Sequence, residues 1–204
     1  MLTRRSAIVS AVSMVGLVPS ILPALAQDAK LTVQPGEFAL GSPDAKVTII
    51  EYASMTCSHC ASFHKTTWPA LKAKYVDSGK VRFVLREYPL DPLALGAFMV
   101  ARCGGEKTYY PITDLLFDKQ ADWAFVQKPL DGLIETLRQT GLTKEKIEAC
   151  LQDQTVFEAV KKSRMEGEAL GVNSTPTFFI NGEKIQGAMT IEALEAKLKP
   201  LLGE

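Results

Sequence analysis

The stretch that decides the fold is Lys46-Val-Thr-Ile-Ile-Glu-Tyr-Ala-Ser-Met-Thr-Cys-Ser-His-Cys60. Residues 46–52 are β-branched and largely apolar, which predicts a buried strand. The strand ends just before Cys57 and Cys60, which are separated by two residues. Apolar side chains then recur at helical spacing over residues 58–77, so we expect Cys57 at the N-terminus of a helix.

The segment after the cysteines completes a βαβ unit. Pro69 is expected to kink the helix over 58–77, and Gly79 to end it. Residues 80–87, Lys-Val-Arg-Phe-Val-Leu-Arg-Glu, have the composition and length of a second strand. We therefore expect two parallel strands joined by a right-handed helical crossover.

The rest of the chain is first helical and then returns to strands. No strand pattern occurs over 91–172, where we predict amphipathic helices at about 92–103, 108–119, 130–140, 143–151 and 153–170. Strands are predicted at 177–180 and 184–186, and Asn181-Gly182 between them favours a two-residue hairpin turn. A last helix is expected over 190–202.

This order predicts an α/β protein with a thioredoxin fold and an inserted all-helical subdomain. Residues 46–90 and 173–204 form the thioredoxin-like domain in this interpretation, and residues 91–172 form the helical insertion. Residues 27–45 are a lead-in, with a short edge strand around 38–40.

The first 26 residues differ from the rest of the chain. Arg4 and Arg5 precede an uncharged stretch, and Ala24-Leu25-Ala26 offers the small residues of a cleavage site. This pattern predicts an export signal, of twin-arginine or general secretory type, cleaved before Gln27. An uncleaved membrane anchor is the alternative, and both place the folded part outside the cytoplasm.

The charge of the chain is balanced. It has 23 basic and 23 acidic residues, and without residues 1–26 the counts are 21 and 23. No net field would hold a nucleic acid or an anionic membrane surface, so a nucleic-acid-binding function is disfavoured.

The pair Cys57-Ser58-His59-Cys60 is the main candidate for chemistry. A thiolate at Cys57 is favoured by the free N–H groups at a helix N-terminus, and His59 adds a switchable positive charge. Cys60, one turn further on, should be more buried and less reactive. Stabilising the thiolate stabilises the reduced pair, which makes the disulfide a stronger oxidant.

Two other roles are open for this pair. It could be a static disulfide, or Cys57, Cys60, His59 and His64 could bind a metal such as zinc. The sequence has no second C-x-x-C and no H-x-x-x-H, which argues against zinc. We favour redox chemistry.

A second candidate element is Ser174-Thr175-Pro176-Thr177. A proline at this place is often cis and presents a backbone edge to an extended peptide. The alternative is an ordinary proline that starts a strand. We favour the first interpretation because a redox-type cysteine pair occurs in the same chain.

Over essentially the whole part after residue 26, the chain resembles DsbA-type thiol-disulfide oxidoreductases. Cys57-Ser58-His59-Cys60 matches the C-x-H-C of that family, and Thr175-Pro176 matches the residue and cis-proline that face it. Position 58 is Ser where the best-known members have Pro, and position 175 is Thr where they have Val. The resemblance also matches Glu51 to a buried acid beneath the active site.

The remaining candidates have less specific signals. Glu51 could either pair with a lysine or handle protons during exchange. Cys103 and Cys150 are expected to form a structural disulfide, with two free buried thiols as the alternative. His64 is expected to have no role. Three apolar residues near the cysteines form either a collar for unfolded peptides or part of the core: Met55, Phe63 and Trp68.

The resemblance implies a periplasmic protein-disulfide oxidase. Its substrates would be reduced or unfolded exported proteins, and a membrane quinone-linked protein such as DsbB would reoxidise it. It would need no cofactor and no metal, and we expect a monomer. A disulfide isomerase or reductase of the same fold is the main alternative, and a non-enzymatic metal-binding module is a more remote one.

Overall fold

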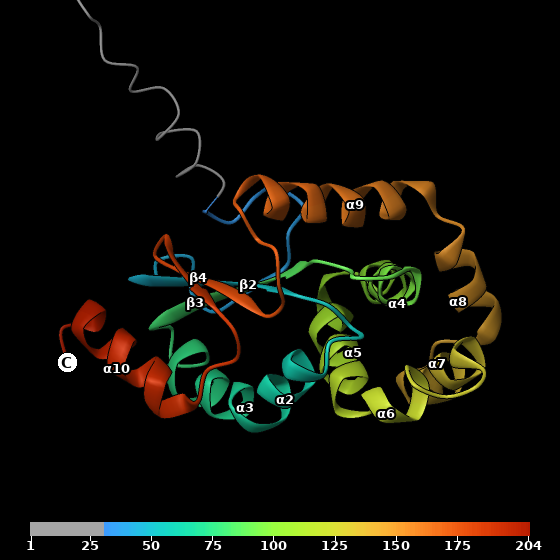
Figure 1. Cartoon of the computed structure of the whole chain (residues 1–204), viewed down its shortest axis with the longest axis horizontal. Coiled ribbons are helices and arrows are strands. Elements are labelled where there is room, and N and C mark those ends of the chain that lie inside the picture. The colour runs from blue at the N-terminus through green and yellow to red at the C-terminus, as the bar shows by residue number, and fades with distance from the viewer. Residues whose placement is uncertain (1–30) are drawn as a thin grey trace, which may run out of the picture.

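A computed structural model of the chain describes residues 31–204 (Figure 1). The export signal predicted for residues 1–26 therefore lies outside the described residues. Over the part of the chain that is described, no helix is both long and apolar enough to cross a membrane.

The centre of the molecule is a five-stranded sheet in the order β1-β3-β2-β4-β5. Its strands are β1 (Ala39–Leu40), β2 (Val47–Ala53), β3 (Val81–Glu87), β4 (Thr177–Ile180) and β5 (Glu183–Gln186). Strands β2 and β3 are parallel, and the other neighbours are antiparallel. The predicted βαβ unit, edge strand and C-terminal hairpin are thus confirmed.

The hairpin turn follows from its two residues. Asn181 and Gly182 both have positive φ angles, 44° and 89°. Two-residue turns that match the twist of a hairpin need this backbone conformation, and Asn and Gly adopt it most readily.

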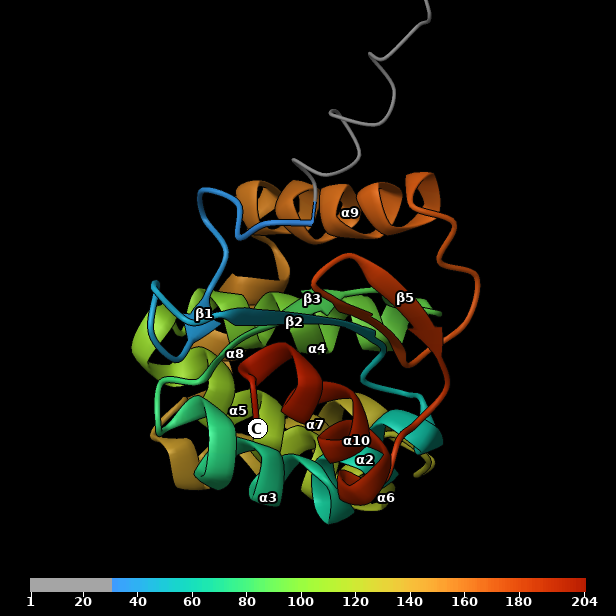
Figure 2. The ribbon, with the colours of Figure 1, turned by 90° about the vertical axis from the view of Figure 1, so that its left-hand side faces the viewer.

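Helices cover both faces of the sheet (Figure 2). One face carries α9 (Gln154–Ala169), and the other carries α2 (Ser58–Thr66), α3 (Trp68–Leu71) and α10 (Ile191–Leu202). Helix α9 approaches the sheet so closely that a Cβ on Gly167 would lie 2.7 Å from the Tyr52 ring.

The segment between β3 and β4 is helical, as predicted. It contains α4 (Pro92–Cys103), α5 (Glu106–Asp118), α6 (Gln120–Trp123), α7 (Pro129–Leu137), a short 3-10 turn (Arg138–Thr140), α8 (Lys144–Leu151) and α9. Helix α5 lies beside α2 at one end of the sheet, and α6 and α7 extend from it away from the sheet (Figure 1). Sequence periodicity missed only the four-residue α6.

The prediction of one kinked helix over 58–77 is wrong in detail. The chain forms α2, breaks at Thr67, continues as α3 and ends in a π-helical turn over Lys72–Val76. Pro69 lies in the first turn of α3, where its missing N–H costs no intrahelical hydrogen bond. At the break, Thr67 Oγ1 donates a hydrogen bond to the carbonyl oxygen of Met189, 2.9 Å away, in the segment before α10.

Candidate active site

Cys57 lies at the N-terminus of α2, directly after the central strand β2. It is the N-cap residue of that helix, and its Sγ accepts a hydrogen bond from the Cys60 N–H at 3.5 Å. Cys57 is 9% exposed, whereas Cys60 is completely buried. Both are free thiols, so the structure holds the pair in its reduced form.

The two thiols differ in acidity. The pKa of Cys57 is lowered to about 5, first by a hydrogen bond from the Cys60 thiol, against an opposing effect of burial. Hydrogen bonds from Thr175 and from the backbone N–H groups of Cys60 and His59 lower it further. Burial raises the pKa of Cys60 well above its ordinary value, helped by the Cys57 sulfur and by the charge of Glu51. The prediction that Cys60 is the more buried of the two is confirmed, and the two pKa values shift in the directions that this prediction implies.

The predicted contribution of His59 needs a correction. Both Ser58 and His59 are exposed, and the part of His59 that lowers the Cys57 pKa is its backbone N–H. A backbone donor keeps its place whatever the protonation state of the ring, because the turn of α2 fixes it.

The second predicted element faces the first. The Thr175–Pro176 peptide bond is cis, and Cys57 Sγ donates to the Thr175 carbonyl oxygen at 3.3 Å. While Cys57 is a thiol, Thr175 Oγ1 is buried and has no hydrogen-bond partner within residues 31–204. Once Cys57 loses its proton, this hydroxyl is the Thr175 donor that lowers the pKa of Cys57. The structure thus brings together two segments that are 118 positions apart.

Glu51 is paired, but with a histidine. It is fully buried on β2, and its Oε2 lies 3.1 Å from His64 Nε2. His64 Nδ1 lies 3.6 Å from Oδ1 of Asp114 on α5. Burial opposes charge on His64, but the two carboxylates outweigh it and raise the pKa of His64 to about 9. The alternative of a lysine partner is therefore wrong, and a pKa of about 9 favours the imidazolium form of His64 at neutral pH.

A residue that sequence analysis missed holds the active-site loop. Gln120 on α6 is buried, and its Nε2 donates to the carbonyls of Met55 at 2.8 Å and Cys57 at 3.0 Å. Thr56 Oγ1 also donates to Asp91 Oδ2 at 2.5 Å, at the start of α4. The helical segment after β3 thus fixes the backbone on which the nucleophile stands.

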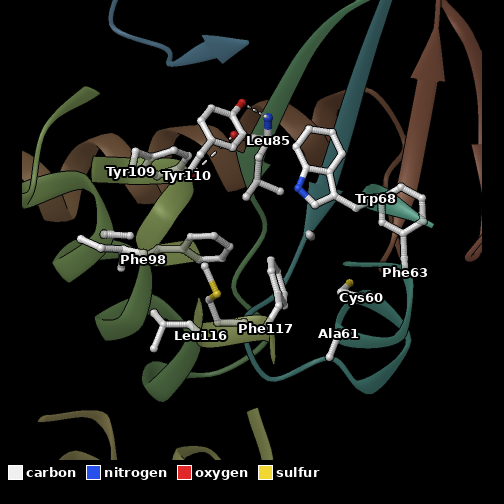
Figure 3. Close-up of a cluster of buried hydrophobic side chains, with 14 of the residues drawn as sticks. Cys60, Ala61, Phe63, Trp68, Leu85, Phe98, Tyr109, Tyr110, Leu116 and Phe117 are labelled. Atoms are coloured by element: carbon white, nitrogen blue, oxygen red, sulfur yellow. Dashed lines mark hydrogen bonds between the residues drawn. The ribbon is translucent and has the colours of Figure 1, made fainter. Parts of the chain in front are cut away.

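The apolar residues near the cysteines belong to the core. Met55, Phe63 and Trp68 are at most 3% exposed, so the structure rules out a surface collar made of them. Figure 3 shows the cluster, which includes Cys60, Phe63 and Trp68 as well as Phe117 of α5. Helix α5 of the insertion covers these side chains, so the sequence alternative of core packing is the correct one.

The proposed metal set is not brought together. His64 faces Glu51 and Asp114, and His59 is exposed. Within the described range 31–204, no group of three or more His, Cys, Asp and Glu side chains has the arrangement of a metal site.

The other two cysteines are joined. Cys103 at the end of α4 and Cys150 in α8 form a disulfide with a Cα–Cα distance of 5.7 Å. It links two helices of the insertion.

An asymmetric dithiol at a helix N-terminus, opposite a cis-proline at the start of an antiparallel strand, defines a thioredoxin-fold redox protein. The chain belongs to this family, because a family model described as thioredoxin matches residues 33–200. Its similarity to alpha-DsbA1 from Wolbachia pipientis and to a curated protein-disulfide oxidoreductase from Rickettsia bellii makes it a DsbA-like member. The predicted fold class is thereby confirmed.

The crystal structure of alpha-DsbA1 from Wolbachia pipientis is similar, with a TM-score of 0.81, 27% identity and coverage of 87% of this chain and 96% of that one. The fold also matches BdbD from Bacillus subtilis, at a TM-score of 0.74 and 20% identity, over 83% of this chain and 94% of that one.

Among curated proteins, a "Putative protein-disulfide oxidoreductase" from Rickettsia bellii is 30% identical over 84% of this chain and 67% of its own length. The Rickettsia typhi protein RT0103, which has the same description, is 31% identical over 74% of this chain and 56% of its own length. The chain thus spans only about 56–67% of the length of these two relatives.

Proposed function

We propose that this protein introduces disulfide bonds into exported proteins by exchange through Cys57 and Cys60. The observation that carries the proposal is the difference between the two thiols, one with a pKa of about 5 and the other well above its ordinary range. At neutral pH the reduced pair is therefore stabilised as one thiolate and one thiol. Stabilising the reduced form favours transfer of the disulfide to another protein.

The exchange follows from the positions of the two sulfurs. A client thiolate attacks Cys57 Sγ of the oxidised pair, the Cys57–Cys60 bond breaks, and Cys60 leaves as a thiolate that takes up a proton. The client's second thiolate then attacks the client sulfur of the mixed disulfide, and Cys57 leaves as a stable thiolate. Two electrons pass from the client to the cysteine pair, so the reaction needs no cofactor.

Thr175 and Pro176 are the proposed contact for the client chain. The loop lies against Cys57 and includes the Thr175 carbonyl, an acceptor that an extended peptide can use. Glu51 is the proposed proton-handling group for Cys60, because the carboxylate is buried beneath the site and its charge acts on that thiol.

The proposed clients are reduced or unfolded exported proteins, and the proposed location is the periplasm. Both proposals rest on the export pattern of residues 1–26 and on the similarity to the DsbA family. A membrane quinone-linked protein of the DsbB type is the proposed reoxidant. We propose that the protein acts as a monomer.

The experiment is a stoichiometric transfer. The protein, oxidised at Cys57 and Cys60, is mixed with a reduced, denatured client that has known disulfides. The proposal predicts one client disulfide per molecule of protein, and no transfer by Cys57→Ala. Failure of the oxidised protein to transfer, combined with rearrangement of scrambled client disulfides by the reduced protein, would instead identify an isomerase.

A further inference from the structure

His64 occupies an environment that packing alone does not explain. Its side chain is 2% exposed, and its ring stacks on Phe117 with centroids 4.1 Å apart. It nevertheless lies between two carboxylates, Glu51 and Asp114. Burying a charged group is costly unless opposite charges compensate it, and here both ring nitrogens face a carboxylate.

The two oxygens of Glu51 have different surroundings. Oε2 pairs with His64 Nε2 at 3.1 Å, whereas Oε1 is buried and has no hydrogen-bond partner in the described part of the chain. The Glu51 charge acts on Cys60, which is equally buried. One oxygen of the carboxylate is therefore fixed, and the other is free to accept a proton.

We propose that His64 is a positioning residue of the redox site, which holds Glu51 by one oxygen so that the other serves Cys60 as proton acceptor and donor. This inference rests on the proposed function, because it assigns the group that orients the proton-handling residue. Helix α5 contributes through Asp114, whose side chain is 37% exposed and reaches the surface.

The step in which His64 acts is closure of the pair from a mixed disulfide. The Cys60 thiol gives its proton to Glu51, and the resulting thiolate attacks Cys57 Sγ. The Cys57–Cys60 bond forms while the bond from Cys57 to the other sulfur breaks, and the other sulfur leaves as a thiolate. When a client is oxidised, the same step runs in reverse and Glu51 returns the proton.

Other titratable groups around His64 are already occupied. Tyr110 of α5 lies close enough to feel the charges of Glu51 and Asp114, but its hydroxyl donates to the Phe38 carbonyl and accepts from the Leu85 N–H. Asp114 Oδ1 is buried next to His64 Nδ1. The charge balance at Glu51 therefore depends on His64.

In the test, glutathione disulfide oxidises the reduced full chain in two steps that are measured separately. Acid quenching and mass spectrometry measure first the glutathione adduct at Cys57 and then closure by Cys60. In His64→Phe, which keeps the aromatic packing but removes both ring N–H groups, adduct formation should stay within about twofold of wild type. Closure should slow about tenfold or more, so the adduct accumulates. His64→Gln, which retains one donor, should recover part of the rate.

A double variant shows whether His64 acts through Glu51. Glu51→Gln should slow closure, and the combination with His64→Phe should be no slower than Glu51→Gln alone. The inference would be overturned if the double variant closed more slowly than Glu51→Gln alone, by the product of the two single effects. It would also be overturned if a folded His64→Phe protein closed at the wild-type rate.

If His64→Phe does not fold, the surface variant Asp114→Asn carries the same test. It should slow closure by a smaller factor, whereas the matched control Asp118→Asn, one turn along α5, should not. Equal closure rates in these two variants would overturn the inference. The potential of the wild-type pair and its transfer to clients test the proposed function separately, since closure by Cys60 occurs in an oxidase and in a reductase.

Discussion

Cys57 Sγ lies 3.3 Å from the carbonyl oxygen of Thr175, the residue that precedes the cis-proline. This contact joins the N-terminus of α2 to the segment that leads into β4, the strand that pairs antiparallel with β2. It also places the buried, free hydroxyl of Thr175 beside the sulfur. The acidity of Cys57 therefore depends on a residue far away in the sequence.

Replacing Thr175 by Val should raise the pKa of Cys57 above its wild-type value of about 5, because a donor to the thiolate is lost. The ultraviolet absorbance of the thiolate, followed as a function of pH, measures the midpoint. Thr175→Ser retains a hydroxyl and should stay close to wild type. Identical titrations of Thr175→Val and wild type would show that the hydroxyl has no such role.

The reduced protein should gain stability relative to the oxidised protein as pH rises from 5 to 9. The folded-state pKa of Cys57 is about 5 against an ordinary value of 9.0, so its contribution is complete above pH 9 and is lost as pH falls through 5. The gain across this window is about 5 kcal/mol.

The raised pKa of His64 has the opposite effect, because its contribution to stability falls as pH rises. It stabilises the fold below 6.5, and that contribution is lost as pH rises through about 9. Because His64 titrates in both redox forms, the difference between reduced and oxidised unfolding free energies isolates the two active-site thiols. Below pH 9 it reports mainly Cys57, because the raised pKa of Cys60 has its effect only near and above that pH. Denaturant unfolding of both forms at several pH values measures this difference, and a flat difference would contradict the thiolate assignment.

Gln120→Ala should destabilise the fold by about 1–3 kcal/mol, because the Met55 and Cys57 carbonyls lose a donor. It should also slow exchange at Cys57, since the loop loses its anchor. The matched control is Gln139→Ala, an exposed residue whose amide bonds only to the Thr136 carbonyl and whose loss should cost less than about 0.5 kcal/mol. An equal loss of unfolding free energy in the two variants would show that Gln120 does not anchor the active-site loop.

The double variant Cys103→Ala/Cys150→Ala should unfold more easily by about 4 kcal/mol, the loop-entropy value for a separation of 47 residues. Chemical denaturation of the oxidised proteins measures the cost. The Cys57 titration should be unaffected, because the main causes of its pKa shift are its burial and its hydrogen bonds with Cys60, His59 and Thr175. A shift in that titration would show that the disulfide acts on the active pair.

Local patterns predicted most elements of this fold. The β-branched run over 46–52, the Asn181-Gly182 pair and the helical periodicity of the insertion each depend on neighbouring residues, and each gave the correct element. The break at Thr67 lies two residues before Pro69, the proline predicted to kink this helix. The hydrogen bond from Thr67 to Met189 escaped prediction because it joins residues 122 positions apart.

The candidate site was predictable only where its chemistry lies in one segment. Cys60 and the N–H groups of the helix, which lower the pKa of Cys57, lie in the same segment as Cys57. Glu51, His64 and Asp114, by contrast, come from three different elements. Gln120 reaches a loop 63 positions away and carries no motif. Met55, Phe63 and Trp68 have an apolar pattern that is the same whether a face is exposed or covered, so only the tertiary structure identified them as core.

The most direct test is the reduction potential of the Cys57/Cys60 pair in glutathione buffers. Thiol trapping followed by mass measurement gives the reduced fraction, and peptide mapping keeps Cys103 and Cys150 apart from the active pair. A stabilised Cys57 thiolate predicts a potential near about −120 mV, the range of a dedicated oxidase. A value near about −270 mV would place the protein among reductases and contradict the proposed function.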